Sequence, residues 1–236
     1  IRLIFLARDS RRKLGETRNI SIRAARGKYC FLHIDADDVW QNFFLSFAQI
    51  YHEIESRLGI SDFMLSGRQI QLASKNVLLE YPYMNLYFGE DRTLWSQLAV
   101  AGKLIVINHK EMRVRIPIQS TRKKIFKVIT SQCSGMITTF SLHPNPIFVL
   151  RKYLYSILIG SPSQPLSGMA RLVRIACLPW AMIYGCFLHR SPLINQHLPN
   201  YLEQNLIDLK KLEDLSLSKF GPYKLNAEER TFYNLD

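Results

Sequence analysis

The sequence has few of the features that would assign it at once to a secreted, zinc-binding or repeat class of protein. Its four cysteines form no C-x-x-C pair, so their spacing predicts neither a zinc site nor a dense disulfide framework. Such cysteine usage is typical of a reducing, cytosolic setting. Neither a signal peptide nor an internal repeat is recognisable. The chain is 47% hydrophobic, so its 236 residues include enough apolar material for a sizeable core.

Acidic residues are almost absent from one long segment. Residues 92–202 contain 14 Lys and Arg but a single acid, Glu111, which gives the segment a charge of +13. The rest of the chain carries the other 17 of the 31 basic residues and 18 of the 19 acidic ones, which gives −1. The whole positive excess therefore lies in one block, which could face nucleic acid or an anionic membrane surface.

The most apolar part of this block is too short to cross a bilayer comfortably. The run at 175–188 has 14 residues, whereas a spanning helix needs roughly 20. Flanking Arg171 and Arg174, together with the aromatic residues Trp180 and Tyr184 inside the run, favour a helix that lies in a membrane surface. A buried core helix is an equally good interpretation of the same run.

A cluster of carboxylates follows a short apolar segment near the start of the chain. Residues 29–34 are mostly aromatic or β-branched, which predicts a strand buried on both faces of a sheet. Asp35, Asp37 and Asp38 come directly after it and repel one another unless a cation is bound. Their oxygen atoms suit Mg²⁺ or Mn²⁺, whereas the spacing does not fit a calcium EF-hand. The alternative is a solvated acidic turn that caps the next helix.

Strands and helices are expected to alternate through the first half of the chain, which predicts an α/β fold with a mostly parallel sheet. The predicted strands are 1–6, 29–34, 62–72, 77–79 and 103–108, and the predicted helices are 17–26, 43–58 with Gly59 as its cap, and 90–101. In such sheets ligands gather at the carboxyl ends of the strands, where the aspartates lie.

The second half is expected to be helical, basic and apolar. It contains a basic amphipathic segment at 122–129, an apolar segment at 148–159, a Ser/Pro-rich link at 160–168 and an amphipathic helix at 201–215. We therefore predict three parts: a catalytic domain at 1–115, a membrane-associating helical region at 116–202, and an amphipathic helix and tail at 203–236.

Two further groups of charged residues allow both a structural and a functional interpretation. Glu90 and Asp91 open a predicted helix, where they would cap it and complement its dipole, or where one of them would act as a general base. Arg113 and Arg115 lie two apart in a predicted strand and would share one face. They would then hold a diphosphate, or form a solvated basic edge strand.

Three motifs in this order resemble those of the family 2 glycosyltransferases, which have the GT-A fold. They are T-R-N-I-S with A-A-R-G-K-Y at 17–21 and 24–29, F-L-H-I-D-A-D-D at 31–38, and G-E-D-R-T-L-W with L-A-V-A-G at 89–95 and 98–102. The family patterns are A-R-N-x-G…A-x-G-x-Y, an F-L-D-x-D-D region, and G-E-D-x-x-L-x-x-R-L-A-x-A-G. The resemblance covers about residues 1–115.

The resemblance implies a nucleotide-sugar donor and assigns roles to particular positions. Asp35, Asp37 and Asp38 match the DxD-type motif that holds a divalent metal, Mn or Mg, and the nucleotide-sugar. Asp91 matches the catalytic base, with Glu90 beside it. Arg18 and Asn19 match positions near the nucleotide.

The sequence departs from the family pattern in three places. The opening strand that ends P-x-Y-N is absent, and because the chain begins at Ile1 rather than Met we expect a fragment or a processed product. Where the family has V-D-D-G-S this chain has L-A-R-D-S, so the nucleotide-contacting acid is missing or shifted to Asp9. Arg113 and Arg115 occupy the region where many relatives carry a histidine.

These observations favour an inverting, metal-dependent glycosyltransferase of hexosyltransferase type. We expect it to be cytoplasmic and peripheral on an anionic membrane face, with a lipid-linked or glycan hydroxyl as acceptor. One alternative is a catalytically degraded remnant of that fold. Another is a basic nucleic-acid-binding or phosphoryl-transfer protein, which is disfavoured because long aliphatic runs interrupt the basic block and no recognition motif is present.

Overall fold

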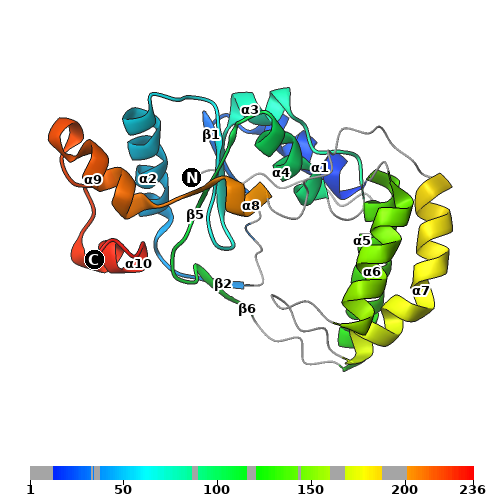
Figure 1. The fold of residues 1–236 in the computed structure, drawn as a ribbon. Helices are drawn as coiled ribbons and strands as arrows, with labels where there is room; N and C mark the ends of the chain where they lie inside the picture. The colour runs from blue at the N-terminus through cyan, green and yellow to red at the C-terminus, as the bar shows by residue number, and fades with distance from the viewer. Residues whose placement is uncertain are drawn as a thin grey trace.

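The protein has an α/β architecture with a separate layer of long helices (Figure 1). The computed structural model describes residues 13–32, 34, 38–86, 90–115, 121–142, 145–159, 168–187 and 201–236. The predicted strand at 1–6, Asp9, Asp35, Asp37 and most of the Ser/Pro-rich link lie outside these residues.

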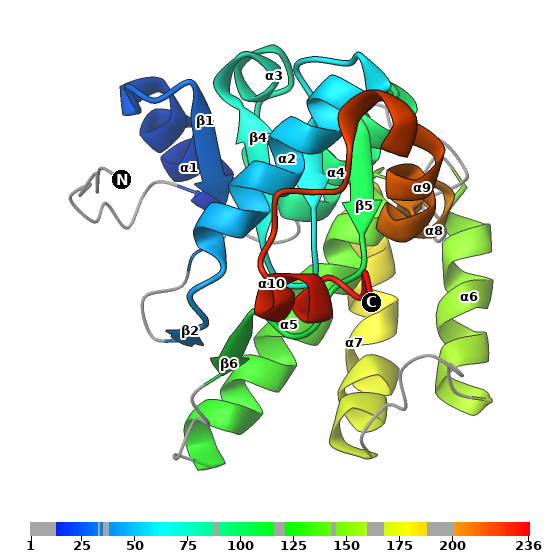
Figure 2. The same cartoon turned by 90° about the vertical axis from the view of Figure 1, so that its left-hand side faces the viewer.

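The main sheet is mixed rather than mostly parallel. Its strands are β1 (Tyr29–Leu32), β3 (Met64–Ser66), β4 (Gln71–Ser74), β5 (Leu104–Ile107) and β7 (Leu206–Ile207), in the order β1-β4-β3-β5-β7. Strand β4 pairs antiparallel with β1 and β3, while β3–β5 and β5–β7 are parallel. The reason is a tight turn after β3, where Gly67 N donates to Ile70 O and returns the chain as a hairpin. Strands β1, β3, β5 and β7 nevertheless run in one direction, and Figure 2 shows β1 and β5 pointing to the same end of the molecule.

The hairpin corrects two predictions about residues 62–79. The single strand expected at 62–72 is two strands, and the strand expected at 77–79 is part of helix α3 (Lys75–Glu80). Ser74 caps that helix, since its hydroxyl accepts from Val77 N at 3.2 Å. The strand at 29–34 is also less buried than predicted, because β1 lies at an edge of the sheet and only Leu32 of its residues is buried.

Side chains that alternate along the strands supply a core on each face of the sheet. Leu65, Leu72 and Ile105 face a core shared with α2 (Phe44–Leu58). Met64, Ala73 and Leu104 face the other core, which also takes residues from α1 (Leu14–Ala24), α3 and α4 (Glu90–Val100). Helix α2 ends as predicted at Gly59, which has φ 63°.

The last residues of the described chain return to the α2 face of the sheet. The single helix predicted at 201–215 is wrong, because α8 (Tyr201–Gln204) is followed by β7 and then by α9 (Leu209–Phe220). Strand β7 pairs with β5, and the Asp208 carboxylate accepts from Lys211 N to start α9. Helix α10 (Ala227–Phe232) follows, and the core shared with α2 includes Leu209, Tyr223, Phe232, Tyr233 and Leu235.

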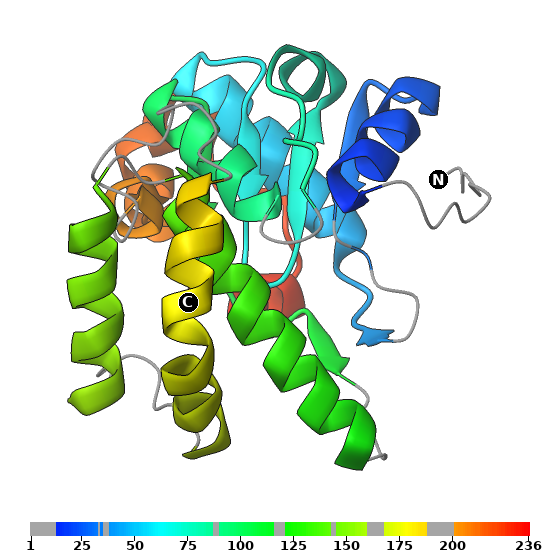
Figure 3. The ribbon, with the colours of Figure 1, turned by 90° about the vertical axis from the view of Figure 1, so that its right-hand side faces the viewer.

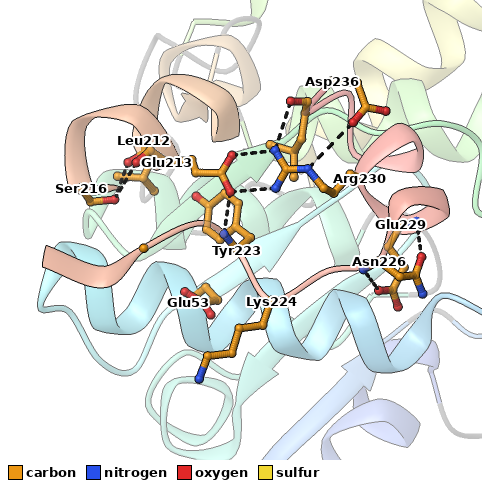
Figure 4. A network of polar contacts seen from close by, with 12 residues as sticks. Glu53, Leu212, Glu213, Ser216, Tyr223, Lys224, Asn226, Glu229, Arg230 and Asp236 are labelled. Carbon is orange, nitrogen blue, oxygen red and sulfur yellow. Dashed lines mark hydrogen bonds and ion pairs between the residues drawn. The ribbon is translucent and has the colours of Figure 1, made fainter. Parts of the chain in front are cut away.

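A buried carboxylate holds α9 and α10 together (Figure 4). Glu213 is 4% exposed and accepts from both terminal nitrogens of Arg230, at 2.9 and 3.0 Å, and from Tyr223 N at 2.5 Å. Arg57 of α2 lies over the Tyr223 ring at 4.3 Å and donates to Gly221 O at 2.8 Å. These contacts fix the C-terminal segment to α2 through charge-assisted hydrogen bonds.

Between Thr121 and Phe187, in the region predicted to be helical, the described residues form three long helices. They are α5 (Thr121–Leu142), α6 (Pro146–Leu158) and α7 (Gly168–Phe187), which form a layer beside the α/β body (Figure 3). A small core between them includes Met136, Phe140, Val149, Leu178 and Ala181. We call these three helices the helical layer.

Candidate active site

The strands that run in one direction bring several predicted site residues to one edge of the sheet. Along the chain, Asp38 follows strand β1, the hairpin turn follows β3, and Arg113 follows β5. A second, two-stranded sheet lies at this edge, formed by β2 (Asp38–Trp40) and β6 (Arg113–Arg115). The carboxyl ends of the strands are where α/β proteins bind ligands, so the position agrees with the expectation from the sequence.

Asp38 and Arg113 form a buried ion pair in this small sheet. Arg113 Nη1 donates to Asp38 Oδ2 at 2.7 Å, and both side chains are 8% exposed. The guanidinium also lies 5.3 Å from the centre of the Trp40 ring, and the Gln69 side chain accepts from Arg113 N at 3.2 Å. Arg113 is therefore neither a solvated edge residue nor open to a diphosphate on its Asp38 side. In register, Arg115 lies opposite Asp38.

A second buried ion pair joins the first and third motifs of the sequence. Arg18 of α1 lies with Nη1 2.7 Å from Oε1 of Glu90, whose side chain is 3% exposed, at the start of α4. Burial raises the pKa of the Glu90 carboxyl above its ordinary value, although the positive charge of Arg18 opposes that shift. Arg18 also lies 5.2 Å from the centre of the Tyr83 ring.

Asn19 holds the segment that carries Tyr83. Its side-chain amide donates to Tyr83 O at 2.8 Å and accepts from Tyr83 N at 2.9 Å, so it pairs with the backbone as a strand would. Beside it, Gly15 N donates to Leu86 O at 3.2 Å. A Cβ on Gly15 would lie 1.9 Å from Met84 O, so only glycine allows this approach. Asn19 thus acts on the protein backbone, and Tyr83, which no motif indicated, belongs to the site.

Asp91 occupies the first turn of α4 next to this pair. Its Oδ1 accepts from Arg92 N at 2.8 Å, and its side chain is half-buried, whereas Glu90 is enclosed. The Thr93 hydroxyl donates to Glu90 O at 2.8 Å and fixes the turn. Of the two acids, Asp91 is therefore the one that a substrate can reach.

His109 is a buried residue at the same edge that the sequence motifs did not indicate. Its Nε2 accepts from Arg68 N at 2.8 Å, and its Nδ1 lies 2.6 Å from Lys110 O, so the proton resides on Nδ1. Burial lowers the pKa of His109 to about 4. Its ring stacks on Phe232 at 5.1 Å, which ties the hairpin turn and β5 to α10. A single buried histidine has no local sequence signal, because its partners are distant in the chain.

The structure brings the predicted residues together in two groups. One contains Arg18, Asn19 and Glu90, with Asp91 beside them, and the other contains Asp38 and Arg113. Among the residues that the structure describes, no group of three His, Cys, Asp or Glu side chains is placed to hold a metal ion. Two of the three predicted metal ligands, Asp35 and Asp37, lie outside that part of the chain.

Comparisons with known proteins add no relative. No protein-family model, no curated protein and no solved structure matches the chain. The chemistry of the site therefore has to be argued from its own residues.

Proposed function

We propose that the protein is an inverting glycosyltransferase that moves a sugar from a nucleoside-diphosphate-sugar to a hydroxyl acceptor. The observation that carries the proposal is the Arg18–Glu90 ion pair, because it joins two motifs that are distant in the sequence. The buried Asp38–Arg113 pair supports it, because it fixes the end of the aspartate cluster at the carboxyl edge of the sheet. The first contact joins the first and third motifs, and the second holds the end of the second motif beside β6.

The donor side of the proposed site is built around the aspartate cluster. Carboxylates of Asp35, Asp37 and Asp38 offer the hard oxygen donors that Mg²⁺ and Mn²⁺ prefer. A divalent ion bound there supplies a Lewis acid for the charge that builds on the leaving diphosphate. Because Arg113 already neutralises Asp38, we assign the direct metal contact to Asp37 with Asp35, and to Asp38 the task of fixing the segment.

The acceptor side is assigned to the start of α4. Asp91 removes the proton from the acceptor hydroxyl as that oxygen attacks the anomeric carbon. A single displacement with one base inverts the configuration at that carbon. Glu90 is enclosed by Arg18 and acts as a positioning residue, because its ion pair holds the first turn of α4 against α1.

The proposed acceptor is a lipid-linked or glycan hydroxyl at a cytoplasmic membrane face. The support is the charge of +13 on residues 92–202, which matches an anionic leaflet. Within the part of the chain that the structure describes, one helix, Gly168–Phe187, is long and apolar enough to cross a membrane, with a mean hydropathy of 1.3, and 28% of that stretch is buried. Length and composition alone do not distinguish such a helix from one that lies on the surface.

Titration calorimetry with UDP and with GDP, each with and without Mn²⁺, tests the donor site. We expect one of the nucleotides to bind in a metal-dependent manner, because the diphosphate and the carboxylates share the ion. Asp37→Asn removes one charged ligand and should abolish the metal-dependent part of the binding. Asp214→Asn, an exposed change on α9, is the matched control and should leave it unchanged. Binding that ignores both Mn²⁺ and Asp37→Asn would refute the donor site.

A further inference from the structure

The outward half of α7 is apolar along its whole length. Seven large side chains lie within this half at helical spacing and are 44–86% exposed: Met169, Leu172, Ile175, Trp180, Ile183, Tyr184 and Phe187. The residues between them on this side are Ala176, Pro179 and Cys186, so the exposed half of α7 carries no charge. Figure 1 shows α7 at the edge of the molecule opposite α9 and α10, with no other described helix or strand outside it. Exposed apolar surface of this extent needs a partner.

The inner half of α7 packs against the other helices of the helical layer. Leu178 and Ala181 belong to the core of the helical layer, and a Cβ on Gly185 would lie 2.5 Å from Phe140 Cβ of α5. Both arginines of α7 lie outside its exposed half, and Arg174 Nε donates to Gln132 at 2.7 Å. A helix that crossed the bilayer alone would lose these contacts, so the packing favours a helix that lies flat.

The neighbouring helix extends the apolar surface and adds positive charge to it. On α6, Phe148, Tyr155 and Leu158 are exposed together with Arg151 and Lys152. Apolar and aromatic side chains bordered by cations are the pattern of helices that lie in a membrane interface.

We propose that α6 and α7 lie parallel to an anionic phospholipid bilayer, with the outward half of α7 inserted at the headgroup boundary. A second copy of the chain is the main competitor for this face. It would bring a second helical layer against the first, and because α5, α6 and α7 contain Lys and Arg but no Asp or Glu, the two layers would repel. An anionic lipid surface brings the opposite charge, so charge complementarity selects the bilayer.

The helical layer also lies next to the candidate base, which deepens the proposed function and rests on it. Arg92 directly follows Asp91, and its positive charge acts on Tyr153 of α6, whose pKa burial raises, and on Arg174 of α7, whose pKa burial lowers. A bilayer docked on α6 and α7 would therefore lie on the helices that adjoin the start of α4. A bilayer on α6 and α7 favours the lipid-linked acceptor of the proposed function over a soluble glycan.

Flotation of the full chain with vesicles tests the proposed surface. We expect co-flotation with phosphatidylglycerol-containing vesicles, and little with pure phosphatidylcholine. Trp180→Glu with Phe187→Glu should reduce the bound fraction by about tenfold or more, because two charges would enter the apolar boundary. The matched control is Leu45→Glu with Leu215→Glu, which alters side chains 80% and 75% exposed on other helices and should float normally.

Each outcome decides between the occupants of the face. A chain that stays at the bottom of the gradient with anionic vesicles at low salt overturns the proposal, as does normal flotation of the Trp180 and Phe187 variant. Sedimentation of the wild type as a dimer that this variant converts to a monomer, without flotation, would assign the face to self-association. Arg151→Glu should weaken flotation at low salt without changing the melting temperature. Nucleotide binding is measured without vesicles, so its result does not depend on the flotation result. Failure of the membrane proposal can therefore be told apart from failure of the proposed glycosyltransferase function.

Discussion

The carboxylate of Glu90 lies 2.7 Å from the guanidinium of Arg18, and this contact joins the start of α4 to α1. Glu90 is almost fully enclosed, whereas Arg18 is 27% exposed and also faces the Tyr83 ring. Removing one partner of such a pair leaves the other charge buried without compensation, and that penalty exceeds the net stability of the pair itself. The stability of the α1–α4 contact should therefore depend on the charge of Glu90.

Arg18→Ala should destabilise the fold, and more at pH 7 than at pH 5. We expect a loss of about 1–3 kcal/mol at pH 7, discounted because Arg18 is partly exposed. Burial raises the pKa of Glu90, and without Arg18 the pKa rises further, so at pH 5 more of the carboxyl is protonated and the penalty shrinks. Urea denaturation at both pH values measures this, with Arg23→Ala, an exposed change on the same helix, as control. Equal losses at the two pH values would contradict it.

Asp91→Asn should show whether Asp91 acts as a base or only stabilises the start of α4. Asp91 lies in the first turn of α4, where its Oδ1 accepts from Arg92 N; Asn keeps an accepting oxygen there but has no basicity, so the melting temperature should stay near that of the wild type. Transfer from the nucleotide-sugar identified by calorimetry should fall by about 10²–10⁴-fold. Full activity in this variant would leave Asp91 only its structural role.

The stability of the protein should fall with pH between about 6.5 and 4 because of His109. The folded pKa is about 4, below the ordinary value of 6.5, so in this window the unfolded chain binds more protons than the folded one. Stability is fully present above about pH 6.5 and is lost as pH falls, by an amount on the order of 3 kcal/mol. His109→Gln should flatten this part of the pH profile in urea titrations. His52→Gln, which alters an exposed histidine of α2, should leave the slope in place.

Cys133 and Cys177 should form a disulfide between α5 and α7 when an oxidant is supplied. Their sulfur atoms lie 2.6 Å apart, although both cysteines are free thiols. Burial raises the pKa of Cys133 to about 11, so exchange with oxidised glutathione should be slow at pH 7 and faster at pH 9, where more thiolate forms. Peptide mapping would find the pair joined with the loss of two hydrogen atoms. Cys186→Ser should not prevent the link, and a mixed disulfide at Cys133 that never resolves would argue against the pairing.

The sequence correctly predicted the elements that depend on residues close together in the chain. Helix α2 was found from its apolar period and ends at Gly59, which adopts the left-handed conformation that its cap requires. The strand expected at 77–79 was wrong because the apolar side chains of Val77 and Leu78 can be buried by a strand or by a helix. The Ser74 cap favours the helix. The helix expected at 201–215 failed because Leu206 and Ile207 pair with β5, which no local pattern could reveal.

The sequence motifs predicted some residues of the candidate site. They did not predict the contacts between those residues or the other residues that pack beside them. Arg18, Glu90 and Asp91 were named from the sequence, but the ion pair between the first two was not. Tyr83 was missed because its place depends on Asn19, whose side-chain amide hydrogen-bonds the Tyr83 backbone. His109 was missed because its environment comes from the hairpin turn and α10. Such long-range contacts depend on the packed fold, which the sequence motifs do not describe.

Strand β7 and the Glu213–Arg230 pair have a consequence for how the chain folds during synthesis. Residues 13–115 build most of the sheet, but the core beside α2 still lacks Leu209, Phe232 and Leu235 when they have been made. The helical layer is synthesised before those residues, so topologically it is an insertion within the α/β body rather than a domain that follows it. The body therefore stays open until the chain has been made as far as Leu235. If the helical layer docks on a bilayer as proposed, the apolar face of α7 would already be available in that interval, and the growing chain would reach the membrane before the α/β core has closed.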